Sequence, residues 1–92
     1  MLAAIVGGRL QGVELACLAQ QAGWQTLVVD GNRQVPAQHL CDRFLQLDVA
    51  DASALDRALM SVDLIIPALE NPFALGRLVQ WGAERGVPVA FD

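Results

Sequence analysis

The chain begins with Leu2-Ala-Ala-Ile-Val6, which runs directly into Gly7-Gly-Arg-Leu-Gln-Gly12. A run of small and branched apolar residues is typical of a parallel strand that is buried on both faces. Residues 13–22 follow the glycine-rich turn, and their composition and apolar spacing predict a helix. Strand, glycine-rich turn and helix in this order open a βαβ unit. The start of the chain therefore predicts an α/β fold built on a parallel sheet.

The glycines of this turn have distinct expected roles. Gly7 and Gly8 permit a tight turn with positive φ, and they leave the backbone open to a ligand because no Cβ covers it. Gly12, one turn into the helix, lets the helix lie close to the strand. The pattern departs from the dinucleotide fingerprint G-x-G-x-x-G, since Arg9 stands where that fingerprint has its second glycine. The turn is either a ligand-binding loop or a purely structural one.

Composition limits the classes of partner. A length of 92 residues indicates one domain, and the net charge of −4 argues against nucleic acid and anionic membranes as partners. No stretch approaches the run of about 18 apolar residues that spans a membrane. Met1 leads directly into the first strand without a basic segment, and Cys17 and Cys41 lack C-x-x-C spacing. We therefore expect a cytoplasmic protein with reduced thiols.

The rest of the chain continues the alternation of strands and helices. Strands are predicted at residues 25–30, 44–48, 62–67 and 87–91, and helices at residues 52–60 and 73–85. Right-handed crossovers then give a Rossmann-like open five-stranded parallel sheet in the order 3-2-1-4-5, with helices on both faces. This order reverses between the first and fourth strands. The turns at residues 7–12 and 68–72 should therefore line one crevice, where a ligand would bind.

The charged residues of this crevice favour a zwitterion. Glu70 would repel a phosphate but suits an ammonium group, and Arg9 opposite it could hold a carboxylate, so the crevice suits an amino-acid-like small molecule. Glu70 could instead only complement a helix dipole. Asp30, at the end of the strand over residues 25–30, has two interpretations as well. It could bind the ribose of a nucleotide cofactor, or it could cap the turn through Gly31 and Asn32.

Groups for catalysis are scarce in this chain. The sequence contains no lysine, and the phosphate-loop pattern is absent. His39, its only histidine, lies in a loop without Cys, Asp or Glu at metal-ligand spacing. Ser53 and Ser61 fall away from the crevice, so no catalytic triad can be assembled. We predict no catalytic residue, no metal site and no ATP-holding group in these residues.

Several segments together resemble the amino-terminal domain of ATP-grasp ligases. They are Gly7-Gly-Arg-Leu-Gln-Gly12, Val28-Val-Asp30, Pro67-Ala-Leu-Glu-Asn71 and Val87-Pro-Val-Ala-Phe-Asp92, and the resemblance covers essentially the whole chain. It implies a Rossmann-like domain that contributes to the substrate site of an amide-forming enzyme, while two later domains hold ATP and magnesium. Carried onto this chain, the substrate-binding residues would be Gly7, Gly8, Arg9, Leu10, Gln11, Gly12, Glu70 and Asn71.

Where such a ligase would continue into its ATP-grasp domains, this sequence stops at Asp92. The resemblance thus implies a fragment of a longer ligase, with those domains in the same or a separate chain. Two other functions remain open. One is a regulatory or redox module that binds NAD(P) or a related nucleotide through Asp30. The other is a structural domain whose apolar surface docks on a partner.

Overall fold

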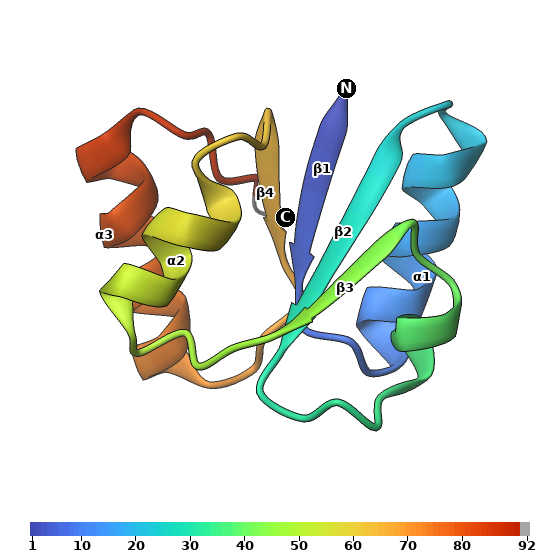
Figure 1. The fold of residues 1–92 in the computed structure, drawn as a ribbon, viewed down its shortest axis with the longest axis horizontal. Helices are drawn as coiled ribbons and strands as arrows, with labels where there is room; N and C mark the ends of the chain where they lie inside the picture. The colour runs from blue at the N-terminus through green and yellow to red at the C-terminus, as the bar shows by residue number, and fades with distance from the viewer. Residues whose placement is uncertain (91–92) are drawn as a thin grey trace.

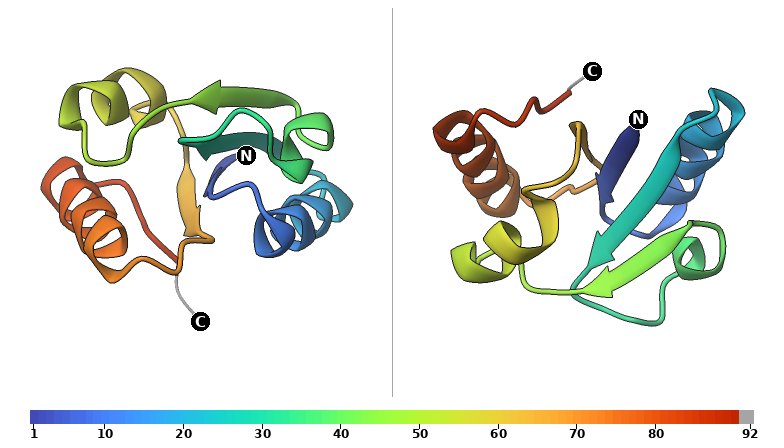
Figure 2. Two further views of the ribbon diagram at one scale, coloured as in Figure 1. Left: turned by 90° about the horizontal axis from the view of Figure 1, so that it is seen from below. Right: turned by 45° about the horizontal axis from the view of Figure 1, so that its top comes forward.

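The computed structural model describes residues 1–90, which form a four-stranded parallel sheet in the order β3-β2-β1-β4. Its strands are β1 (Leu2–Val6), β2 (Gln25–Asp30), β3 (Arg43–Gln46) and β4 (Leu64–Pro67). Helices α2 (Ala52–Leu59) and α3 (Pro72–Arg85) lie on one side of the sheet (Figure 1). Helix α1 (Leu10–Gln21) and a short 3₁₀ helix, η1 (Pro36–His39), lie on the other (Figure 2). The predicted Rossmann-like α/β sheet with helices on both faces is confirmed.

Strand β1 lies at the centre of two hydrophobic cores. Residues 3–6 of this strand expose no surface, as its unbroken apolar composition predicts. Side chains alternate between the two faces of a strand. Ala4 and Val6 therefore pack in the core that contains Leu59 and Leu78 of α2 and α3, whereas Ile5 packs with Ala16 of α1.

The prediction of a fifth strand at residues 87–91 is wrong for the described residues. This segment forms one bridge to β4, in which Ile65 N donates to Pro88 O at 2.9 Å and Ala90 N donates to Ile65 O at 2.8 Å. The next donors along the two segments would be Pro67 and Pro88, which carry no N–H. Proline thus removes the neighbouring hydrogen bond on each side of the bridge. Phe91, the end of the predicted strand, lies outside the described residues.

Local signals set the ends of the helices. Asp51 Oδ1 accepts hydrogen bonds from the backbone N–H groups at the start of α2, and Asn71 Oδ1 does the same for α3. Gly23 and Gly86 follow α1 and α3 with φ of 82° and 72°, and this left-handed conformation favours glycine. These helix ends follow from the local preferences of the residue types.

A polar cluster on α2 and α3 ties the two helices together. Arg85 Nε donates to Asp56 Oδ1 at 2.5 Å, and Trp81 Nε1 donates to the same oxygen at 2.8 Å. The Arg85 guanidinium also lies 5.1 Å from the centre of the Trp81 ring, a cation–π distance. The hydrogen bonds from Arg85 and then Trp81 hold the pKa of the Asp56 carboxyl below its ordinary value of 3.8.

We expect Asp56→Asn to destabilise the domain at neutral pH and to lose this effect in acid. A carboxyl with a lowered pKa in the folded state stabilises the fold above its ordinary pKa of 3.8, and that contribution disappears as the pH falls through the lowered value. Urea unfolding at neutral and at strongly acidic pH measures the difference in the free energy of unfolding between Asp56→Asn and the parent chain. Glu14→Gln, on the exposed side of α1, is the control. A difference that is independent of pH would contradict the assignment.

Candidate functional site

The two predicted turns line one crevice at the carboxyl edge of the sheet. Both α1 and α3 begin at this edge (Figure 1), and the turns before them lie side by side when the molecule is seen from below (Figure 2). The crevice has a volume of about 400 Å³. It is lined by Gly7, Arg9, Leu10, Gln11, Asp30, Ala68, Leu69, Glu70 and Asn71. Of the predicted substrate-binding residues, Gly8 and Gly12 lie behind this lining, and a ligand role for the whole set stays a prediction.

Close backbone contacts require two of the glycines. Gly7 has a φ of 119°, and a Cβ on it would lie 2.5 Å from the carbonyl oxygen of Ala68. A Cβ on Gly12 would lie 2.0 Å from the carbonyl oxygen of Gly7 and 3.8 Å from Ile5 Cγ2. The expectation that Gly12 brings α1 close to β1 is therefore confirmed. The glycines hold the turn, α1 and the end of β4 in contact.

Gly8 differs from its predicted role. It is buried and its φ is not positive, and Val35 Cγ2 lies only 2.4 Å from the position of a Cβ on it. The segment around η1 also donates Ala37 N to Gly8 O at 3.0 Å. The backbone of Gly8 is thus covered by residues from an irregular stretch. The apolar pair Val35 and Ala37 within this polar stretch is the sequence signal for that contact.

Asp30 makes intramolecular hydrogen bonds with both of its oxygens. Oδ1 accepts from Asn32 N at 2.8 Å, which is the predicted cap of the turn. Oδ2 accepts from Gly8 N, also at 2.8 Å, across 22 residues of sequence. The neighbouring donor, Gly7 N, is bonded to Val29 O at 2.7 Å. The first two N–H groups of the glycine turn are therefore occupied within the protein.

Arg9, Gln11 and Glu70 are the exposed polar side chains that the two turns bring to the crevice. Asn71 is partly committed, because its Oδ1 accepts from Phe73 N at 2.9 Å and from Ala74 N at 3.3 Å. Its amide nitrogen remains as a donor. The crevice thus offers a guanidinium from the first turn and a carboxylate from the second. Such a pair can bind a ligand that carries both a carboxylate and an ammonium group.

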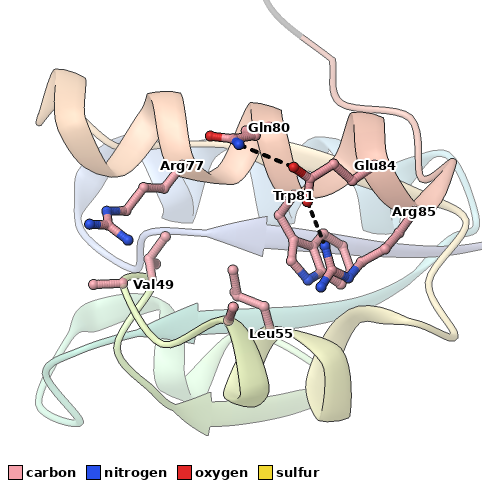
Figure 3. A pocket seen from close by; sticks show the side chains of 9 residues that line it. Val49, Leu55, Arg77, Gln80, Trp81, Glu84 and Arg85 are labelled. Atoms are coloured by element: carbon pink, nitrogen blue, oxygen red, sulfur yellow. Dashed lines mark hydrogen bonds and ion pairs between the residues drawn. The ribbon is translucent and has the colours of Figure 1, made fainter.

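A second cavity, of about 180 Å³, lies between α3 and the segment before α2 (Figure 3). Glu84, which lines it, accepts from Gln80 at 3.1 Å and from Arg85 at 3.2 Å (Figure 3). The charges of Glu84 and Arg85 therefore satisfy each other. Among residues 1–90, no group of His, Cys, Asp and Glu side chains is placed to hold a metal ion. No helix within the same residues is long and apolar enough to cross a membrane.

Comparison with known sequences shows two kinds of relative. No family model matches the chain. The 3-methyl-D-ornithine–L-lysine ligase of Methanosarcina barkeri is 34% identical over 89 residues, which are 96% of this chain and 24% of the ligase. The N5-carboxyaminoimidazole ribonucleotide synthase of Staphylococcus saprophyticus is 36% identical over 67 residues, or 73% of this chain and 18% of the synthase. The chain thus spans about a quarter, or less, of the length of these relatives.

Solved structures show the same fold in more than one class of enzyme. The N5-carboxyaminoimidazole synthetase of Staphylococcus aureus in complex with ADP has a TM-score of 0.82 and 24% identity, over 96% of this chain and 23% of the synthetase. The saccharopine dehydrogenase of Saccharomyces cerevisiae has a TM-score of 0.80 and 20% identity, over 99% of this chain and 22% of that enzyme. Ligases and a dehydrogenase share the architecture, so the fold alone does not select the chemistry.

Proposed function

Because this chain is homologous to the amino-terminal domain of ATP-grasp ligases, we propose that it is the substrate-binding domain of an ATP-dependent carboxylate–amine ligase. The proposed reaction joins 3-methyl-D-ornithine to L-lysine, a step of pyrrolysine biosynthesis, in the cytoplasm. The proposed reaction is supported by sequence identity of about a third, over nearly the whole chain, to ligases that join these two amino acids. The proposal assigns to this domain the recognition of an amino-acid-like substrate.

The presence of both Arg9 and Glu70 in the lining of one crevice is the structural observation that carries the proposal. Opposite charges on the two turns match the carboxylate and the ammonium group of an amino acid. A phosphate would meet the carboxylates of Asp30 and Glu70 with Arg9 as the one cation in the lining. The side-chain charges of the crevice therefore favour an amino acid over a nucleotide.

The residues described here do not fit ATP and its magnesium ion. The chain has no lysine, and no cluster of acidic side chains in residues 1–90 is placed to hold a cation. We therefore assign the ATP and magnesium of the proposed ligase to ATP-grasp domains in the same or a separate chain. We assign no catalytic residue to this domain.

Replacing Glu70 with glutamine is expected to weaken binding of the amino-acid substrate by at least about tenfold. The substitution keeps the shape of the side chain but removes a charge-assisted hydrogen bond, which contributes about 1.5–3 kcal/mol. Calorimetric titration of 3-methyl-D-ornithine and of L-lysine measures the effect. Glu84→Gln, on the exposed side of α3, is the matched control. Equal affinity in the Glu70 variant and the parent protein would remove Glu70 from the site.

A nucleotide-binding regulatory or redox module is the second candidate. It is favoured by the βαβ start and by Asp30 at the end of β2. Titration of NADH, NADPH, ATP and AMP separates the two candidates. Micromolar binding that depends on Asp30 would favour the module, whereas amino-acid binding that depends on Glu70 favours the ligase domain.

A further inference from the structure

We infer that Asp30 is a specificity-determining residue which closes the crevice to phosphate groups. Its carboxylate occupies the backbone N–H of Gly8 at 2.8 Å, in the place where a bound anion would be held in a glycine-rich turn. The inference concerns the same crevice as the proposed function and rests on that crevice being the ligand site. It adds a second reason to expect that nucleotides do not bind there.

A second hydrogen bond and partial burial hold Asp30 in this role. Asn32 N donates to its second oxygen at 2.8 Å, so the carboxylate is fixed from both sides. Asp30 is half-buried and also lines the crevice, so its charge faces the space that a phosphate would enter. A phosphate reaching the turn would have to displace a charge-assisted hydrogen bond and then lie beside the displaced carboxylate.

The structure behind Gly8 prevents an easy rearrangement. Val35 packs against Gly8 at the position of its missing Cβ, and Gly8 O accepts from Ala37 N at 3.0 Å. Gly7 N is bonded to Val29 O at 2.7 Å, so it cannot replace Gly8 N as a donor. The turn therefore has its first two donors satisfied and a negative charge fixed in front of them.

The experiment compares pyrophosphate binding by Asp30→Ala, Asp30→Asn and the parent chain, at one ionic strength, by calorimetry. Asp30→Ala removes the charge and both acceptor oxygens, whereas Asp30→Asn removes the charge and keeps one of the two acceptor oxygens. Asp48→Ala is the matched control, because Asp48 Oδ1 accepts from Ala50 N at 2.9 Å in a similar turn outside the crevice. It changes the net charge by the same amount.

We expect pyrophosphate affinity at least about tenfold higher in Asp30→Ala than in the parent chain or Asp48→Ala, with Asp30→Asn in between. Equal affinity in folded Asp30→Ala and the parent chain would overturn the inference. If Asp30→Ala does not fold, Asp30→Asn decides in the same way. Amide exchange gives an independent reading, since an unprotected Gly8 N–H in the parent chain would also refute it. Amino-acid binding is measured in a separate titration. A negative result with pyrophosphate would therefore overturn the inference about Asp30 without contradicting the proposed ligase function.

Discussion

Replacing Gly12 with alanine is expected to lower the free energy of unfolding by at least about 2 kcal/mol. In an ordinary helix this substitution is favourable by about 1 kcal/mol, because alanine loses less backbone entropy on folding. Here the new Cβ would lie 2.0 Å from the carbonyl oxygen of Gly7. The obstacle is backbone rather than a flexible side chain, so α1 must move away from the turn at Gly7. The clash therefore outweighs the gain in helix propensity.

Gly76→Ala is the matched control for this prediction. Gly76 also lies inside a helix, but nothing lies within 4 Å of the position where its Cβ would be. We expect this variant to be more stable than the parent chain by about 0.5–1 kcal/mol. Chemical unfolding of both variants measures the contrast in sign. Equal effects of the two substitutions would show that Gly12 is not required for the contact between α1 and the turn.

Truncation of Leu78 to alanine is the other change with a large expected effect. Leu78 exposes no surface and lies in the core formed by α2, α3 and one face of the sheet. The same core contains Leu59, Ile65 and Trp81. Loss of a fully buried leucine removes apolar burial and leaves a cavity, which costs about 2–5 kcal/mol. We expect the urea midpoint to fall while the slope of the transition stays the same.

Leu18→Ala provides the comparison for Leu78. Leu18 is also in a helix but is 61% exposed, so its truncation should change the free energy of unfolding by no more than about 0.5 kcal/mol. A loss in Leu18→Ala as large as that in Leu78→Ala would mean that the outer face of α1 is covered in solution. Such a result would favour the docking interpretation of the apolar surface.

The proposed ligase function and the inference about Asp30 depend on different residues of the crevice. The ligase proposal requires Glu70 to bind an ammonium group, and the inference on Asp30 requires its carboxylate to keep phosphates out. Both carboxylates line the same cavity with Arg9. If Glu70→Gln leaves amino-acid affinity unchanged, Asp30 can still exclude pyrophosphate. Conversely, Glu70 can bind the amino acid even if Asp30→Ala leaves pyrophosphate affinity unchanged.

The sequence by itself determined the features that depend on neighbouring residues. The apolar run of β1, the caps at Asp51 and Asn71, and the glycines after α1 and α3 all act within one turn or one strand, so pattern and propensity predict them. The sequence also predicted that the two turns line one crevice, because right-handed crossovers leave little choice of strand order.

Only the tertiary structure decided what the glycine turn offers a ligand. The bond from Gly8 N to Asp30 and the packing of Val35 on Gly8 join residues more than 20 positions apart. The apolar character of Val35 indicates burial, but no local pattern shows which residue it packs against. The pairing beside β4 likewise stops at a single bridge, because Pro67 and Pro88 have no N–H to continue it on either side. Each of these features depends on pairing between distant segments, which is established only when the sheet and its helices pack together.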